Sequence, residues 1–171
     1  MKWTLVVLGS LVSLVLVIVV VGLILPQSHV ASRRARFKRS AASLFPVLTD
    51  FGAFPTWRPG VTKVEMLAPR EAKTSFRETG TQGALTFVVE EVTPPKRLVT
   101  RVVDNSAFGG TWTFELVDQG DDCEVAITER GEVYNPVFRV MSRLFFSQTA
   151  TLEGYLRALG TKMGEQVEPH A

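Results

Sequence analysis

Residues 112–128 read WTFELVDQGDDCEVAIT, and they carry the clearest secondary-structure pattern in the chain. On both sides of the polar turn Asp118–Asp122, apolar residues occupy every second position: Trp112, Phe114, Leu116, Val125 and Ile127. A period of two is the side-chain period of a β-strand, and a short polar turn between two such runs indicates a hairpin. The stretch therefore predicts two antiparallel strands with one buried face and one face in water.

Similar runs extend outward from the hairpin, and Pro- and Gly-rich turns separate them. The predicted strands are Val30–Arg39, Val61–Leu67, Lys73–Thr79, Ala84–Val92, Arg97–Asp104, Gly110–Val117 and Cys123–Val133. Short connections between successive strands are typical of an antiparallel meander. Between the first strand and the meander, we expect two short helical segments, Ala41–Asp50 and Phe51–Trp57, before the turn at Pro59 and Gly60.

The pattern changes after Pro136, where apolar residues return at intervals of three and four. They are Phe138, Met141, Leu144, Phe145, Leu152, Leu156, Leu159 and Met163, with one interval of seven across Gln148. This spacing predicts one amphipathic helix of about seven or eight turns. So long a helix has to lie across the sheet, and we expect the sheet to curve around it.

A curved sheet around one long helix leaves a space that is either filled by large side chains or kept as a pocket. The side chains expected to line this space are Trp57, Trp112, Phe114, Tyr134, Phe138, Met141, Phe145 and Leu152. Aromatic residues and methionine are also common core residues, so the sequence leaves open whether they fill the space or line it.

The chain has few of the residues that usually catalyse reactions or bind metal ions. The single cysteine, Cys123, excludes an internal disulfide and a multi-cysteine zinc site, and no histidine lies between His29 and His170. A Ser–His–Asp triad is therefore excluded, and we expect no cofactor and no metal. The acid–base candidates on strands are Arg101, Glu115, Glu129, Arg130 and Tyr134, residue types that solvated strand faces usually carry.

The N-terminal segment is continuously apolar. Thr4–Leu25 contains no charged residue, and a helix of this length would span about 33 Å, enough for the hydrocarbon layer of a bilayer. A secretory signal peptide is the alternative, but its apolar run is shorter and a small-x-small cleavage site follows it. We therefore expect a transmembrane anchor over residues 1–27 and one folded domain over residues 28–167.

A basic cluster follows the apolar segment, and it contains Arg33, Arg34, Arg36, Lys38 and Arg39. Positive residues beside a span favour the cytoplasmic side, so we predict a single-pass cell-membrane protein with a cytoplasmic domain. The cluster is also expected to contact anionic headgroups at the membrane surface. Residues 41–171 carry 13 Lys and Arg against 17 Asp and Glu, which argues against a nucleic-acid partner.

Three stretches resemble the SRPBCC superfamily, which includes START-like and polyketide cyclase/dehydrase-like domains. They are Leu44–Asp50 with Phe54–Val61, the hairpin at 112–128, and Thr151–Leu159. The resemblance implies an α+β helix-grip fold: a curved, antiparallel, seven-stranded sheet around a long C-terminal helix, with two short helices after the first strand. In this chain one transmembrane helix would precede that domain. The resemblance also implies a cavity for a lipid, sterol, quinone or polyketide-like ligand.

Three functions follow as hypotheses. The first is a membrane-tethered domain that binds or carries a hydrophobic small molecule, with that molecule and membrane lipids as its partners. The second is a cyclase- or dehydratase-type enzyme, because some members of the superfamily catalyse such reactions. The third is a non-catalytic interaction module with a filled interior, whose protein partner the sequence does not identify.

Overall fold

The computed structural model describes residues 2–81, 83–145, 147 and 149–171, and the side chains of Lys2, Leu5 and Phe145 lie outside what it describes. Its elements are α1 (Lys2–Ile24), β1 (Ser28–Phe37), α2 (Ala41–Thr49), the 3-10 helix η1 (Phe51–Thr56), β2 (Val61–Arg70), β3 (Lys73–Gly80), β4 (Gly83–Thr93), β5 (Arg97–Val103), β6 (Phe108–Gln119), β7 (Asp122–Val133), α3 (Pro136–Phe145) and α4 (Ala150–Met163).

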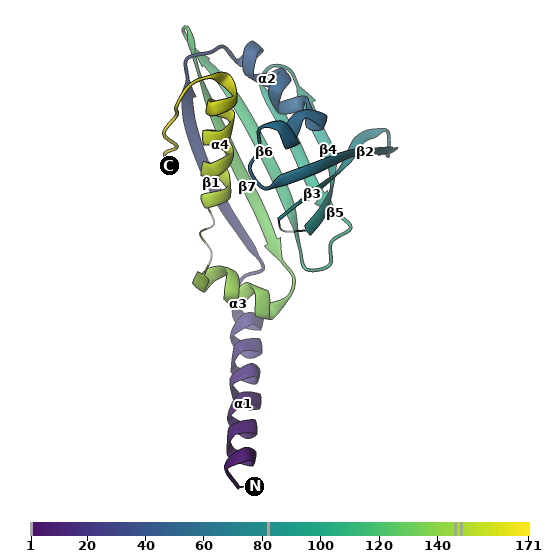
Figure 1. Ribbon diagram of the computed structural model, residues 1–171, viewed down its shortest axis with the longest axis vertical. Helices are drawn as coiled ribbons and strands as arrows, with labels where there is room; N and C mark the ends of the chain where they lie inside the picture. The colour runs from purple at the N-terminus through teal and green to yellow at the C-terminus, as the bar shows by residue number, and fades with distance from the viewer. Residues whose placement is uncertain (1, 82, 146, 148) are drawn as a thin grey trace.

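The seven strands form one antiparallel sheet in the order β1-β7-β6-β5-β4-β3-β2. Six consecutive strands make the predicted meander, and β1 closes the order by pairing with the last strand, with Ala31 opposite Glu129 and Phe37 opposite Cys123. Figure 1 shows β2 crossing the direction of β1 and β7, so the sheet is strongly curved. The helix-grip fold class is confirmed.

The core lies on the concave face, where α2, η1 and α4 pack (Figure 1). The predicted alternation is confirmed at the hairpin, because Phe114, Leu116, Val125 and Ile127 are buried and their polar neighbours are not. In β1, Ala31, Ala35 and Phe37 are buried in the same way. α4 contributes Leu152, Leu156 and Leu159, which are fully buried.

The prediction of one long terminal helix is wrong. The chain forms two helices here: α3 ends at Phe145, α4 begins at Ala150, and the apolar pattern has its interval of seven between them. The start of α4 is held on β1, because the Arg33 guanidinium bonds to Glu153 Oε1 at 2.9 Å and to Thr149 Oγ1 at 3.2 Å. α3 lies instead at the foot of the domain, across the end of α1 (Figure 1).

The last residues of the chain also join the domain. The backbone of His170 pairs with that of Arg34 through two hydrogen bonds of 2.9 and 3.0 Å, on the outer edge of β1. Val167 is buried against the core and contacts Gly160. This C-terminal segment therefore covers part of one sheet edge.

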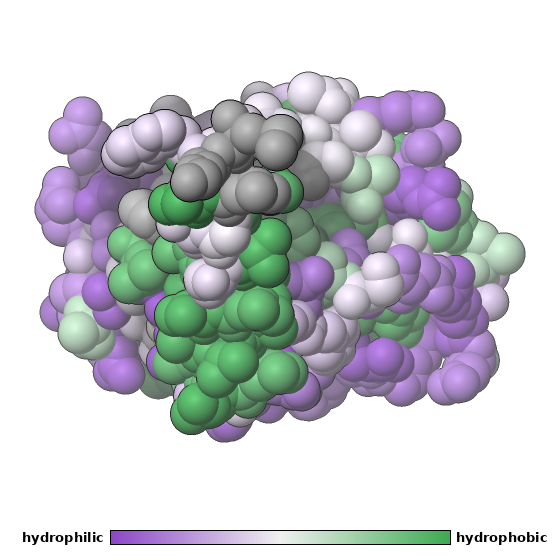
Figure 2. Space-filling view, turned by 90° about the horizontal axis from the view of Figure 1, so that it is seen from below, coloured by the Kyte–Doolittle hydropathy of each residue, from purple (hydrophilic) through white to green (hydrophobic). Residues whose placement is uncertain are grey.

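α1 projects away from the sheet (Figure 1). Most of its described side chains are exposed, and in the described part of the chain Val6–Ile24 is the one helical stretch long and apolar enough to cross a membrane. Seen from below, hydrophobic residues gather in one block around this projecting helix, whereas the flanking surfaces are mostly hydrophilic (Figure 2).

Candidate functional site

A small cavity of about 50 Å³ lies between the concave face of the sheet and α4. Its walls come from α2, η1, β3, β4, β5, β6 and α4. They consist of Leu48, Phe51, Phe54, Arg58, Phe76, Glu78, Phe87, Leu98, Thr100, Trp112, Phe114 and Tyr155. Most of these side chains are aromatic or aliphatic, so the wall suits an apolar or aromatic molecule.

The aromatic side chains explain why the cavity is small. The Phe76 ring stacks between those of Phe51 and Phe87, with centroid distances of 4.4 and 5.2 Å. The Tyr155 ring lies 5.2 Å from that of Phe114 and 5.4 Å from that of Trp57. Rings in these stacked and tilted arrangements interact favourably, so they occupy most of the space under α4.

One end of the cavity is polar. The Arg58 Nη1 atom donates to Glu78 Oε2 at 2.5 Å, and the two side chains are only 16% and 14% exposed. The guanidinium also lies 4.6 Å from the ring centroid of Phe54 and 4.7 Å from that of Tyr155. A cation above two aromatic faces and beside a carboxylate is held in one orientation, which makes it a fixed electrostatic feature of the wall.

Tyr155 brings a hydroxyl group to the same region. Its side chain is 6% exposed, and burial raises its pKa well above the usual range, so the hydroxyl keeps its proton. Among the described residues, this hydroxyl has no hydrogen-bond partner. A hydroxyl group that makes no hydrogen bond within the protein can donate one to a molecule in the cavity.

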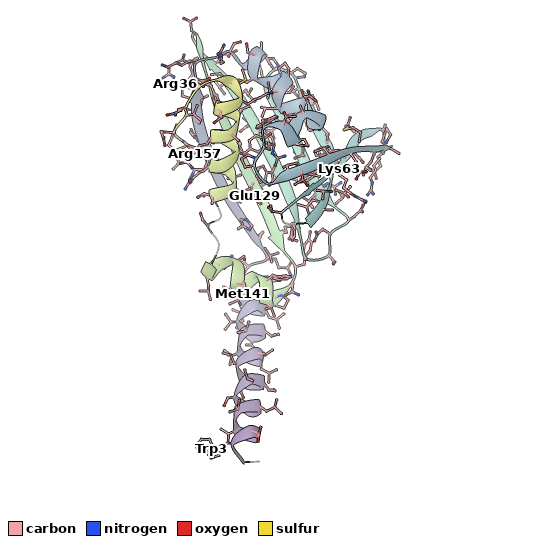
Figure 3. The ribbon with its side chains drawn as sticks, viewed as in Figure 1. Trp3, Arg36, Lys63, Glu129, Met141 and Arg157 are labelled. Carbon is pink, nitrogen blue, oxygen red and sulfur yellow. The ribbon has the colours of Figure 1, made fainter. Side chains whose placement is uncertain are left out.

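The concave face also carries one acidic side chain closer to the foot of the domain. Glu129 of β7 is half-buried, and Figure 3 places it beside the lower end of α4. Burial raises the pKa of its carboxyl group, while the nearby His29 and a hydrogen bond with the Trp112 side chain act in the opposite direction. Glu129 therefore holds its proton more tightly than an exposed glutamate does.

The expected lining residues divide into two groups. Trp112 and Phe114 line the cavity, Trp57 packs behind its wall against Phe54, and Leu152 is fully buried in the core. The Trp57 indole Nε1 is buried without a hydrogen-bond partner in the described part of the chain.

Three of the other expected lining residues, Tyr134, Phe138 and Met141, do not line the cavity. Phe138 and Met141 are exposed on α3, because the helix that was to carry them across the sheet is broken. The exposed Tyr134 hydroxyl donates to Glu132 Oε2 at 2.8 Å. The side chain of Phe145, the last residue expected there, lies outside the described residues.

Of the five acid–base candidates, four do not lie on the concave face. Arg101 pairs with Glu90, Glu115 pairs with Arg97, and Arg130 is exposed. Tyr134 forms the exposed hydrogen bond described above. Glu129 is the candidate that remains near the interior.

The sequence pattern did not identify the polar residues of the cavity. Arg58 follows Trp57 in what the sequence presents as a turn, and Glu78 stands two residues after the buried Phe76 on the inward face of β3. Tyr155 lies three residues after Leu152, which puts it on the buried face of α4. Such spacings indicate that Glu78 and Tyr155 face inward. No pattern of neighbouring residues indicates that residues 58, 78 and 155 lie close together.

The membrane-surface role expected for the basic cluster is not supported by its position. β1 leads away from α1, and Figure 3 places Arg36 at the opposite end of the domain. At about 3.3 Å per residue, Lys38 and Arg39 lie roughly 30 Å beyond the start of the strand. Arg33, Arg34 and Arg36 pair with Glu153, Glu124 and Asp122, at 2.9, 3.6 and 2.8 Å. The basic cluster therefore does not form a single surface that faces the membrane.

The described residues contain no group of three or more His, Cys, Asp or Glu placed to hold a metal ion. Cys123 is fully buried, and burial raises the pKa of its thiol to about 11, which makes it a poor nucleophile.

A family model described as "Polyketide cyclase / dehydrase and lipid transport" matches residues 28–164. No curated protein matches the chain in sequence. Among solved structures, the fold is similar to that of a START superfamily protein from Mycobacterium smegmatis, at 20% identity and a TM-score of 0.64, covering 80% of this chain and 97% of that chain.

Two similar structures are those of proteins named as enzymes. Norcoclaurine synthase from Thalictrum flavum is 15% identical, with a TM-score of 0.63 over 81% of this chain and 88% of that chain. The Zhui aromatase/cyclase from a Streptomyces species is 11% identical, with a TM-score of 0.58 over 77% of this chain and 91% of that chain. At these identities the likeness concerns the fold alone.

Proposed function

Since the chain belongs to the polyketide cyclase/dehydrase and lipid transport family, we propose that it binds a hydrophobic small molecule between the sheet and α4. The observation that carries the proposal is the aromatic cavity with one polar end, formed by Arg58, Glu78 and Tyr155. Apolar walls with a few convergent polar groups are typical of small-molecule sites.

The wall chemistry defines the class of ligand. The aromatic rings favour a flat or aliphatic body, such as a lipid, a quinone or a polyketide-like molecule. The Tyr155 hydroxyl favours an acceptor oxygen on that body, because this oxygen would accept the hydrogen bond that the hydroxyl does not make within the protein. A carbonyl or phenol oxygen at one end of an apolar molecule meets both conditions.

The size of the cavity sets a condition on binding. A volume of about 50 Å³ is far below the roughly 300–1,000 Å³ of drug-sized ligand sites. A lipid or polyketide-like ligand therefore has to displace aromatic side chains or extend toward Trp112 and Glu129, which are half-buried. We propose the second route, because Trp112 and Glu129, which lie toward the start of α4, are less completely buried than most of the cavity wall.

A cavity-filling variant tests the proposal in the full chain. Thr100 is buried on the cavity wall, and its neighbour Val99 in β5 lies on the other face of the sheet. Thr100→Ile adds bulk to the wall, while Val99→Ile adds it outside, and a β-branched residue suits a strand at both positions. The readout is native mass spectrometry of apolar molecules that co-purify with each protein.

We expect the wild-type protein and Val99→Ile to carry the same apolar molecule, and Thr100→Ile to lose it. Lipids held by α1 are common to all three proteins and cancel in the comparison. If none of the three differs, the interior is a packed core, and an anchored interaction module replaces the binding proposal.

We also propose that α1 is a retained, single-pass membrane anchor with the domain on the cytoplasmic side. Its long, exposed, apolar surface supports this, because such a helix is unfavourable in water. The N-terminal sequence of the mature protein separates an anchor from a cleaved signal sequence. A reporter fused to the C-terminus reads the side of the membrane, and an external reporter would contradict the cytoplasmic orientation.

Catalysis of a cyclisation or dehydration is the second candidate function, and Glu129 favours it. A half-buried carboxyl group with a raised pKa suits general acid–base catalysis. In an assay with an aromatic polyketide-like substrate, Glu129→Gln should abolish turnover without abolishing binding. Equal turnover by both proteins, or none by the wild type, would argue against this candidate.

A further inference from the structure

α3 exposes an apolar face that nothing in the described part of the chain covers. Val137, Phe138, Met141 and Leu144 share one side of this helix, and Phe138 and Leu144 are 56% and 69% exposed. The other side carries the buried Arg139 and Val140 together with Arg143. A short helix with apolar residues on one side and arginines on the other is amphipathic.

α3 is packed directly against the C-terminal end of α1. A Cβ atom on Gly22 would lie 2.1 Å from the backbone oxygen of Pro136, so the two backbones touch where a glycine permits it. Figure 3 places Met141 at this junction. The apolar face of α3 is therefore continuous with the end of the apolar surface of α1 (Figure 2).

Arg139 holds this junction. Its side chain is 4% exposed, and Nη1 donates to Gly22 O at 2.7 Å and to Leu25 O at 3.0 Å. Nε and Nη2 donate to Val133 O and Tyr134 O, both at 3.0 Å. One guanidinium thus satisfies carbonyl groups that are left free at the end of α1 and ties them to the end of β7.

We propose that α3 is an interfacial helix that lies in the plane of the membrane crossed by α1, with Phe138, Met141 and Leu144 inserted among the lipids. This inference rests on the proposal that α1 is a membrane anchor. It goes beyond that proposal, because an anchor alone leaves a domain free to tilt and rotate. Held at α1 and at α3, the domain keeps one fixed face toward the bilayer.

A lipid surface suits this helix better than a protein partner. The helix lies where the apolar span ends, which is the level of the headgroup region if α1 crosses the bilayer. Apolar side chains of an interfacial helix enter the acyl boundary there, while arginines lie beside the phosphates. Arg143 is exposed on the same helix and donates to Pro26 O at 3.4 Å, at the end of the span.

Spin labels on the full chain test the inference. Single substitutions Phe138→Cys and Leu144→Cys carry the label, and the native Cys123 is fully buried and stays unlabelled. Val12→Cys in α1 is the lipid reference, and Lys63→Cys on β2, far from α1, is the water reference. Each protein is reconstituted in vesicles of phosphatidylcholine and phosphatidylglycerol, and accessibility to oxygen and to a water-soluble nickel complex is measured.

We expect the labels at 138 and 144 to move toward the Val12 reference, with higher oxygen accessibility and lower nickel accessibility than at Lys63. Labels at 138 and 144 that match Lys63, while Val12 is in lipid, would overturn the inference and leave the anchor standing. A water-accessible label at Val12 would instead overturn the anchor. Labels at 138 and 144 that are immobile and shielded from both reagents would indicate a protein partner, which also overturns the inference.

Discussion

Tyr155 contributes both to the packing of the cavity wall and to its polar chemistry. Its ring packs against Phe114 and Trp57, and its hydroxyl makes no hydrogen bond within the described part of the protein. Removal of a hydroxyl that makes no hydrogen bond within the protein, without loss of packing, is nearly neutral for stability. Proteins keep such groups where a ligand uses them.

We predict that Tyr155→Phe changes the free energy of unfolding by less than about 1 kcal/mol, because the ring stays and the hydroxyl that is removed makes no hydrogen bond within the protein. Urea unfolding measures this, and the same variant should bind the co-purifying molecule more weakly. A clear loss of stability would mean that the hydroxyl already has a hydrogen-bond partner in the folded protein.

Glu129 predicts a dependence of stability on pH. Burial raises its pKa above the ordinary 4.5, so the native state binds this proton more tightly than the unfolded state. The contribution of Glu129 to stability is therefore complete below the ordinary value and is lost as the pH rises toward the raised native value. Glu129→Gln has no such proton to lose.

The variant should therefore gain stability relative to the wild type as the pH rises through this window. Urea unfolding of both proteins at one pH below the window and one above it gives the difference, and all other carboxyl groups cancel. A difference that stays constant with pH would contradict the raised pKa of Glu129.

At the scale of elements, the junction of α1 and α3 depends on one small residue. Gly22 allows the backbone of Pro136 to approach, whereas a Cβ atom on Gly9 of the same helix would meet nothing within 4 Å. Both substitutions by alanine raise helix propensity by about 1 kcal/mol, so this effect is common to them. Steric conflict with α3 is particular to Gly22.

We predict that Gly22→Ala detaches α3 from α1 and speeds amide hydrogen exchange in Pro136–Phe145, while Gly9→Ala leaves it unchanged. Hydrogen exchange of the full chain in detergent micelles or vesicles measures both. Equal exchange in the two variants would mean that the close approach of the helices is not needed to hold α3.

The whole molecule consists of a domain with one core and a helix outside it. The core joins the sheet to α2, η1 and α4, and in the described part of the chain α1 contributes no side chain to it. The domain and α1 should therefore unfold separately, because they share few buried contacts.

Leu156→Ala tests this separation, since Leu156 is fully buried in the centre of the core. We predict a loss of about 2–5 kcal/mol in the free energy of unfolding of the domain. After the domain has unfolded in detergent, circular dichroism should retain the same residual helical signal in variant and wild type. A residual signal that disappears together with the domain would show that α1 depends on the core.

The local patterns of the sequence predicted most of the fold. The alternation at Trp112–Leu116 and at Val125–Ile127 shows which face of each strand is buried. Adjacent residues are enough to see this pattern, so it can be predicted from the sequence. The break between α3 and α4 was not predicted, because Phe138 and Met141 continue the helical spacing of Leu152 and Leu156 across the gap. Both helices are amphipathic, but only α4 faces the sheet.

The strands, the short helices, the apolar N-terminal helix and the family can be predicted from local sequence, because each depends on contiguous residues. The meeting of Arg58, Glu78 and Tyr155, the contact of Arg139 with the end of α1, and the direction of the basic strand away from α1 are visible in the three-dimensional structure alone. Such contacts join residues far apart in the chain. They depend on how the sheet curves and where the helices lie, which no local spacing specifies.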